Sequence, residues 1–255
     1  MGWTLCLLLA SFSATADEPE PQYSPVVREA LAALDASDSF AAYGLIEAQP
    51  DLAQVGQAYL DLAMALYWDR KDLPAAVETA TVGSAYTLSA AKRAEGSDPK
   101  LAALGQRIAM LLTYNLASFT WPGWAEPGVS PSPGDVTRGL DAAKAHVRIA
   151  EGLGVGDLER SRAHWVLGAQ WLAAGDYAAA HTEFLGAADL ARAAAEAIEA
   201  LNAVACARLA YRLQHANSAA AREAFAQALK ALDEAEANDF FTQQVRRCER
   251  VFAGF

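Results

Sequence analysis

Positive charge is scarce in this chain of 255 residues. The chain has 20 Lys and Arg residues against 31 Asp and Glu residues, which gives a net charge of −11 at pH 7. An acidic surface repels the phosphates of nucleic acids, so we expect no nucleic-acid partner. The sequence also lacks a polybasic segment that would attract an anionic membrane.

Signatures of catalysis are lacking too. A zinc helix of the protease type needs two His residues four positions apart, but the His residues are scattered: His146, His164, His181 and His215. No Gly-Lys-Ser/Thr phosphate loop occurs. The glycines of "GLGVGDLE" (residues 152–159) follow no strand pattern, which argues against a dinucleotide site. We therefore expect no enzymatic activity, no metal and no cofactor.

The N-terminus carries an apolar run from Trp3 to Phe12, followed by small residues that end at Ala16. Such a run before an A-x-A site predicts a secretory signal peptide over residues 1–16, cleaved near Ala16. The segment lacks the usual Lys or Arg at its start, and a buried N-terminal helix is the alternative. A permanent anchor would need about 20 apolar residues. We expect an exported protein, periplasmic or secreted, with no stable membrane insertion.

Cysteine is rare, and two residues of this type remain after removal of the signal peptide, Cys206 and Cys248. They lie 42 positions apart, about one helical repeat, so their helices are expected to be neighbours. An oxidising compartment would allow a disulfide between them. The alternative is two small buried hydrophobic side chains.

Strand patterns are absent as well, because no run of β-branched residues alternates with polar ones. Residues 17–25, "DEPEPQYSP", form a Pro-rich lead-in, and a single all-α domain is expected over residues 26–255. A first helix is expected directly after Pro25. Further helices are expected at about 55–70, 74–95, 98–119, 135–152, 158–174, 177–197, 198–215, 218–237 and 239–252.

One internal pattern stands out in "HWVLGAQWLAAGDYAAAHTEFLGAADLA", residues 164–191. Its marked positions are Leu167-Gly168, Trp171, Gly175-Asp176-Tyr177, Ala180, Phe184 and Ala187. The segment resembles a tetratricopeptide repeat, a unit of about 34 residues in two antiparallel helices with the pattern W-x2-L-G-x2-Y and then A-x3-F. Small residues at 168 and 180 would let the two helices approach. Two departures are His164 at the first aromatic position and the absence of a closing proline.

Weaker copies of this unit flank it. The small residues of the paired helices are 12 positions apart in the clear copy and 13, 26 and 16 apart in the others. The second copy therefore carries about 14 extra residues between its helices. The resemblance covers about residues 55–237 and implies four antiparallel helix pairs, capped by the C-terminal helix "NDFFTQQVRRCERVF". A bundle of helix pairs without superhelical order is the alternative.

The extra residues form an insertion loop at residues 119–134 that is rich in proline and tryptophan. Four prolines exclude a continuous helix and stiffen the loop: Pro122, Pro127, Pro131 and Pro133. Its aromatic side chains, Phe119, Trp121 and Trp124, can each bury about 150–250 Å², so we expect them to dock. Either they pack on the array between its second and third helix pairs, or the loop leans over the groove as a lid or aromatic anchor.

The repeat resemblance implies binding by shape, with the first helices of the pairs lining a concave face that holds a protein or peptide partner. Residues expected at this site are Tyr67, Trp68, Asn115, Phe119, Trp121, Trp124, Arg162 and Trp165; Trp68 and Trp165 could equally belong to the core. Binding of a small apolar or aromatic molecule between groove and loop is the alternative function. Self-association through the groove is a third.

Overall fold

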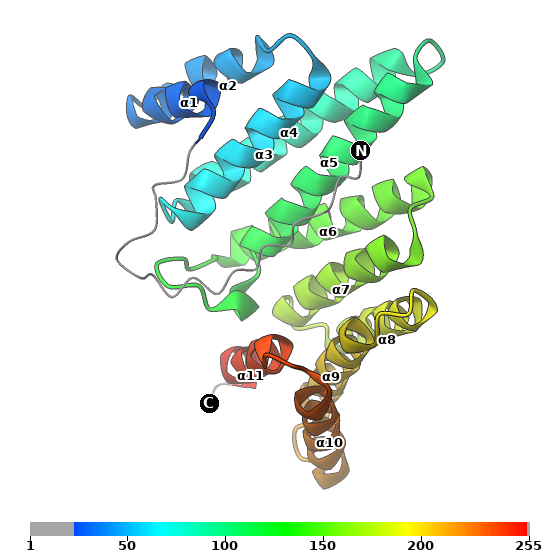
Figure 1. Ribbon diagram of the computed structural model, residues 1–255. Helices are drawn as coiled ribbons and strands as arrows, with labels where there is room; N and C mark the ends of the chain where they lie inside the picture. Colours follow the sequence, from blue (N-terminus) through cyan, green and yellow to red (C-terminus); the bar gives the residue numbers. More distant parts are fainter. Residues whose placement is uncertain (1–22, 254–255) are drawn as a thin grey trace.

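Eleven α-helices and one short 3₁₀ turn make up residues 23–253, the part of the chain that the structure, a computed structural model, describes (Figure 1). The helices are α1 (Pro25–Asp35), α2 (Ser39–Glu47), α3 (Leu52–Trp68), α4 (Leu73–Ala94), α5 (Pro99–Phe119), α6 (Pro133–Leu153), α7 (Asp157–Ala173), α8 (Tyr177–Ala193), α9 (Ala197–Gln214), α10 (Ala219–Ala235) and α11 (Phe240–Ala253); the 3₁₀ turn is η1 (Pro122–Trp124). No strand occurs within these residues. The all-helical class predicted from the sequence is confirmed.

The N-terminal predictions fall largely beyond this range. The expected signal peptide, residues 1–16, lies outside the described residues, as does most of the Pro-rich lead-in. The lead-in ends at Pro25, which is the first residue of α1. Between residues 23 and 253, none of the helices combines the length and the apolar character that a membrane-crossing segment requires.

Aspartate residues explain where many of the helices begin. The side chains of Asp51, Asp72, Asp98 and Asp176 each accept a hydrogen bond from the backbone N–H three residues further on. Each bond satisfies one of the free N–H groups of a first turn. The nine helices expected after residue 55 all occur, with ends within four residues of the prediction. Helix α2 was missed, because its residues are mostly apolar and show no one-sided periodicity.

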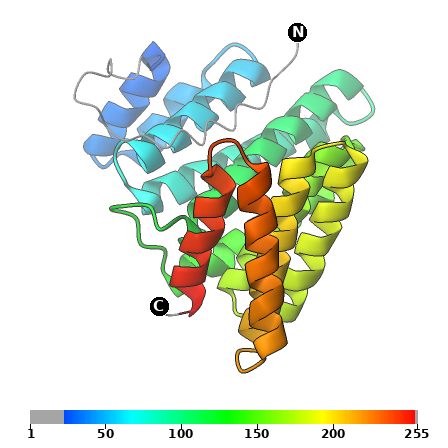
Figure 2. The same cartoon turned by 60° about the horizontal axis from the view of Figure 1, so that its bottom comes forward.

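The helices are arranged in two layers. Each helix packs against the next one in the sequence, and the substantial contacts between helices two apart join odd-numbered ones: α1 with α3, α3 with α5, α5 with α7, and α9 with α11. The odd-numbered helices thus form one layer and the even-numbered helices the other. Helix α11 folds back beside α9 and α10 (Figure 2).

This odd-numbered layer opens between α7 and α9. Helix α8 packs closely against both, yet α7 and α9 have no substantial direct contact within the described chain. The space between them is where the larger side chains of the two helices can form a pocket.

Small residues set the spacing between paired helices. A Cβ atom on Gly168 would lie 2.9 Å from the ring of Phe184, so α7 and α8 approach closely at the residue where the repeat pattern required it. A Cβ atom on Gly105 would lie 2.6 Å from the carbonyl oxygen of Thr87, which is closer than such atoms can approach. Helices α4 and α5 therefore pack at a distance that only glycine permits.

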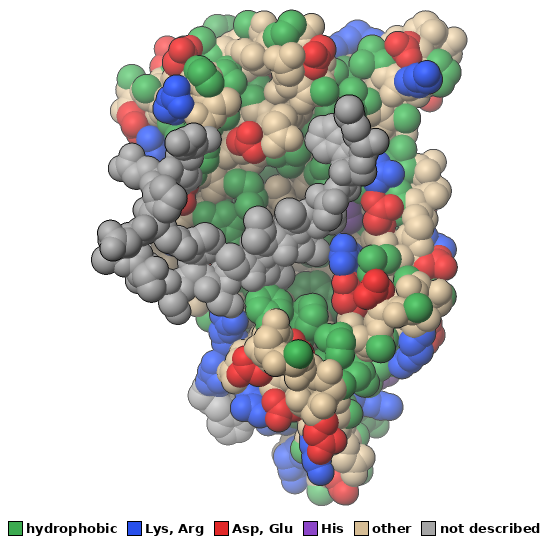
Figure 3. Space-filling view, in the orientation of Figure 1, with side chains coloured by type: hydrophobic (Ala, Val, Ile, Leu, Met, Phe, Trp, Pro, Cys, Tyr) green, Lys and Arg blue, Asp and Glu red, His purple; other side chains and the backbone are tan. Residues whose placement is uncertain are grey.

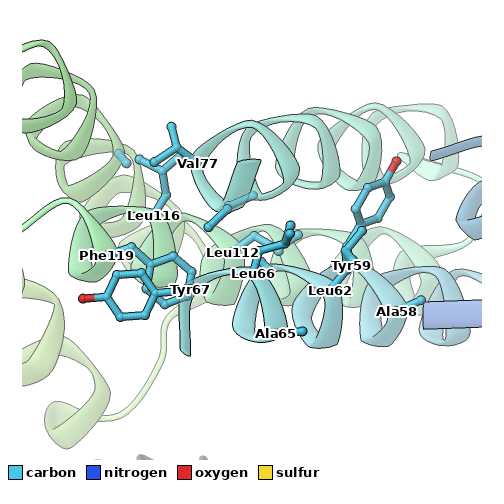
Figure 4. Packing of buried hydrophobic residues seen from close by; sticks show 14 of the residues in the cluster. Ala58, Tyr59, Leu62, Ala65, Leu66, Tyr67, Val77, Leu112, Leu116 and Phe119 are labelled. Carbon is cyan, nitrogen blue, oxygen red and sulfur yellow. The ribbon is translucent and has the colours of Figure 1, made fainter. Parts of the chain in front are cut away.

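Two residues expected at the binding site belong to the core instead. Tyr67 is 1% exposed and Phe119 is 3% exposed. Their rings stack with centroids 4.2 Å apart and an interplanar angle of 13° (Figure 4). The contact joins the C-terminal ends of α3 and α5, and it places both side chains out of reach of a partner.

His146 gives the fold a measurable response to acid. Its ring is buried in α6, and Nδ1 donates a hydrogen bond to the carbonyl oxygen of Met110 at 2.8 Å. Burial lowers the pKa of His146 to about 4. The unfolded chain binds the proton at an ordinary pKa of about 6.5. Stability is therefore lost as the pH falls from about 6.5 towards 4, where the unfolded state binds more protons.

We expect this histidine to lower the free energy of unfolding by about 2 kcal/mol between pH 7 and pH 5. The variant His146→Gln should lose that part of the pH dependence, because its side chain cannot bind the proton but can still donate to Met110. Urea denaturation at the two pH values, followed by circular dichroism, measures the difference. An equal pH dependence in the two proteins would contradict the assignment.

Candidate binding pocket beside the tryptophan loop

The loop between α5 and α6, residues 120–132, is called here the tryptophan loop. Trp121 is 2% exposed. Its ring packs edge-on against Trp124 at 5.0 Å and Trp165 at 5.3 Å, measured between centroids, and lies 6.3 Å from Phe252 of α11. This first tryptophan is therefore a packing residue that joins the loop to α7 and α11.

Trp124 is held differently. Its Nε1 donates a hydrogen bond to the carbonyl oxygen of Ser118 at 2.9 Å, which fixes the ring against the end of α5. Helix α11 contacts the backbone here. Arg247 donates a hydrogen bond to the carbonyl oxygen of Trp124 at 3.5 Å, and the thiol of Cys248 lies 3.8 Å from the carbonyl oxygen of Gly123. The indole face is left half-buried at the wall of a pocket.

The middle of the tryptophan loop is fastened to the turn between α3 and α4. Glu126 accepts a hydrogen bond from Lys71 at 2.6 Å in an ion pair that is largely shielded from water. Lys71 also lies 5.4 Å above the ring of Trp68, a cation–π contact. The loop is thus held at Trp124 and at Glu126, and Trp68 supports the second attachment rather than lining a pocket.

A pocket of about 370 Å³, called pocket 1, lies in the opening between α7 and α9. Side chains from α5, α7, α9, α11, the tryptophan loop and the turn between α10 and α11 line it: Tyr114, Trp124, Ser161, Arg162, Trp165, Glu199, Asn202, Asn238, Phe240, Phe241 and Gln244. Helix α11 and the loop close one side. The lining is therefore aromatic, with amide and charged groups between the rings.

The charged groups of pocket 1 neutralise each other. Arg162 donates to Glu199 through Nε at 3.1 and 3.2 Å and through Nη2 at 2.5 Å. These bonds raise the pKa of Arg162. Burial raises the pKa of the Tyr114 phenol to about 12, so the phenol is uncharged at neutral pH. The pocket therefore presents no net charge and suits an uncharged group.

Two polar side chains at the wall of pocket 1 have unused hydrogen-bonding capacity. The side-chain oxygen of Gln244 is buried and has no partner among the described residues. Asn202, 4% exposed, has one weak contact, with the thiol of Cys206 at 3.7 Å. Such groups cost about 1–3 kcal/mol each when left unpaired.

A second pocket of about 410 Å³, called pocket 2, lies between α3 and α5. Its lining is mainly aliphatic: Ala53, Gln57, Leu60, Leu104, Arg107, Ile108, Leu111 and Glu159. Arg107 donates to Glu159 at 2.5 Å, so this pair too is neutralised. Both pockets lie between odd-numbered helices.

The two pockets follow one face of α5. Leu104, Arg107, Leu111 and Tyr114 succeed each other at intervals of three or four residues, which places them on the same side of the helix. The first three line pocket 2 and Tyr114 lines pocket 1. The pockets are therefore consecutive hollows of one surface.

The structure brings together three of the residues expected at the site. Trp124, Arg162 and Trp165 line pocket 1. Trp121 is buried instead, because α11 covers the loop, and Asn115 is half-buried but lines neither pocket. The two expectations for the loop thus apply to different residues, with Trp121 packing on the array and Trp124 facing the groove.

Sequence reasoning missed the contributions of α9 and α11. Glu199, Asn202 and Gln244 reach pocket 1 from helices that carry no specific copy of the repeat pattern. Asn202 and Gln244 are polar positions within otherwise apolar helix faces, and that interruption was the signal available. Within residues 23–253, no group of three or more His, Cys, Asp or Glu side chains could hold a metal ion.

No protein-family model matches the chain, and neither the curated proteins nor the solved structures contain a match. The fold itself defines the class: an all-helical protein whose eleven described helices pack in adjacent pairs.

Replacing Trp121 should affect stability more than replacing Trp124. We expect Trp121→Ala to lower the free energy of unfolding by about 3–5 kcal/mol, because it leaves a cavity between α7, α11 and the loop. Trp124→Ala removes a half-buried ring and should cost less than half as much. Urea denaturation followed by circular dichroism measures both. Equal losses would mean that the first ring has no special packing role.

Cys206 and Cys248 are buried free thiols within one hydrophobic cluster. Burial raises the pKa of Cys206 to about 12 and raises the pKa of Cys248 well above its ordinary value, so both groups stay as thiols at neutral pH. The structure has no disulfide between them, and a disulfide under oxidising conditions stays one of the two alternatives left open by the sequence. Alkylation in denaturant without reduction, followed by mass spectrometry, should label neither cysteine if the disulfide forms; labelling of both would contradict the disulfide.

Proposed function

We propose that the protein is an exported, non-catalytic binding or scaffold protein that holds a segment of a protein or peptide partner against its odd-numbered helices. The single observation that carries this proposal is the pair of pockets along one face of α5. A small molecule needs one enclosed hollow, whereas an extended chain uses several in a row. Export is supported by the apolar run and small residues of the N-terminus.

The proposal includes a tetratricopeptide-like arrangement. In that arrangement the first helix of every pair faces the concave side and contacts the first helix of the next pair. The contacts between odd-numbered helices support it, together with the Gly168 and Phe184 packing of the clearest repeat. The opening between α7 and α9 and the covering helix α11 are departures that belong to this chain.

A second candidate function is binding of a small uncharged aromatic molecule. One observation favours it: the tryptophan loop and α11 close one side of pocket 1. Its volume of about 370 Å³ lies within the usual range of small-ligand pockets, about 300–1,000 Å³. This ligand would occupy pocket 1 alone and leave pocket 2 free.

The variant Leu111→Arg tests the peptide function. Leu111 is half-buried at pocket 2, and an arginine there should fill the hollow and reduce peptide affinity by at least about tenfold. Peptides are first selected from a random display library on residues 17–255, and their dissociation constants are measured by isothermal titration calorimetry. A small aromatic ligand in pocket 1 should bind the variant as well as it binds the wild type.

Leu88→Arg is the matched control, because Leu88 is 38% exposed on α4, in the even-numbered layer. We expect it to bind the selected peptides as the wild type does. Circular dichroism melting must show both variants folded, and light scattering reports any self-association. Equal affinities of the two variants, or no enriched peptide at all, would exclude the concave face as a peptide site.

A further inference from the structure

The pockets differ in the side chains they can receive. Pocket 2 has aliphatic walls, including Leu60, Leu104 and Ile108. Pocket 1 has aromatic walls, with the rings of Trp124 and Trp165 6.2 Å apart and 38° from parallel. Aromatic rings pair with such walls in offset or edge-on geometry. Pocket 2 therefore fits an aliphatic side chain, and pocket 1 fits an aromatic one.

Helix geometry gives the distance between the hollows. The α5 residues at the middle of pocket 2 and at pocket 1, Ile108 and Tyr114, are six positions apart, or about 9 Å along the helix axis. Pocket 1 is also displaced sideways by one to two helix spacings of about 8–10 Å each. The separation is roughly 15–20 Å, which an extended peptide spans in about five residues.

Charge on the groove is not fully balanced. The two arginines at the pockets, Arg107 and Arg162, are each paired with a glutamate. Asp61 of α3, which is half-buried, accepts a hydrogen bond from Gln57 of pocket 2 at 2.7 Å and has no cationic partner among the described residues. Burial raises the pKa of its carboxyl. A basic group would therefore be attracted beside pocket 2.

The charge of the whole chain also favours a basic group beside pocket 2. Where described residues are visible in Figure 3, hydrophobic side chains lie among charged side chains of both signs. The net charge of −11 adds a long-range attraction for basic segments. The apolar hollows and the surrounding charge thus favour a ligand with apolar side chains next to basic ones.

We infer that the ligand is an extended peptide segment with two anchoring side chains about five residues apart. An aliphatic side chain with a basic neighbour occupies pocket 2 beside Asp61, and an aromatic side chain occupies pocket 1 between Trp124 and Trp165. The inference rests on the proposed peptide function and adds the spacing and chemistry of the segment. It needs no free terminal carboxylate, because both arginines at the pockets are already paired.

Synthetic peptides of the form acetyl-Lys-Leu-linker-Phe-amide, with Gly/Ser linkers of one to eight residues and in both orders, test the spacing. Fluorescence anisotropy of labelled peptides gives the dissociation constants. We expect the tightest binding with linkers of about three to five residues, at least about tenfold tighter than with one residue. Affinities that vary less than about threefold across the series would overturn the inference.

Two matched comparisons assign the anchors to their pockets. With the best peptide, Leu111→Arg should weaken binding as much as replacing the peptide's Leu by Ala does, and the two changes together should cost no more than either alone. Replacing the peptide's Lys by Glu should weaken binding to the wild type but have little effect on Asp61→Asn. Additive losses in either comparison would contradict the placement.

The outcomes distinguish failure of the two-anchor inference from failure of the proposed peptide function. If library-selected peptides bind through Leu111 and the linker series shows no optimum, only the two-anchor inference fails. If no peptide of either kind binds, both proposals fail together. A small aromatic amide that binds through Trp165 but ignores Leu111→Arg would then support the second candidate function.

Discussion

The ring of Trp121 joins three parts of the chain that are far apart in the sequence. It is enclosed by Trp124 of its own loop, Trp165 of α7 and Phe252 of α11. Burying a ring of this size contributes on the order of 4–6 kcal/mol. Among the described elements, α11 has substantial contacts with α9, α10 and η1. The packing of Trp121 against Phe252 therefore helps to fix the position of α11. The wall of pocket 1 that α11 supplies therefore depends on the packing of Trp121.

Two glutamines, Gln170 and Gln244, are buried near the tryptophan loop. The amide nitrogen of Gln170 donates to the carbonyl oxygen of Ala117 at 2.5 Å and to the hydroxyl of Thr120 at 3.2 Å, which ties α7 to the start of the tryptophan loop. The side-chain oxygens of Gln170 and Gln244 both lack a partner among the described residues. They differ in position, since only Gln244 lies at the wall of pocket 1.

The fold was largely predictable because its determinants are local. Aspartate caps, glycine stops and apolar periodicity act within one or two turns, and they located ten of the eleven described helices. The site was less predictable, because the choice between neighbouring residues depends on tertiary contacts. Tyr67 and Trp68 point about 100° apart on α3, and only the stacking partner Phe119 decides that Tyr67 is buried. The return of α11 to the loop likewise has no local signal.

Pocket 1, in the opening between α7 and α9, and the net charge of the chain affect different steps of binding. The charge acts on the arrival of a partner, and the pocket acts on which partner stays bound. Arg162 and Glu199 span the opening and cancel each other, so pocket 1 itself is neutral. The rest of the molecule is strongly acidic. Long-range fields mainly change how fast a charged partner arrives, whereas buried contacts govern how slowly it leaves. Salt should therefore act on association with this protein, while the shape and spacing of its two hollows determine which segments remain bound.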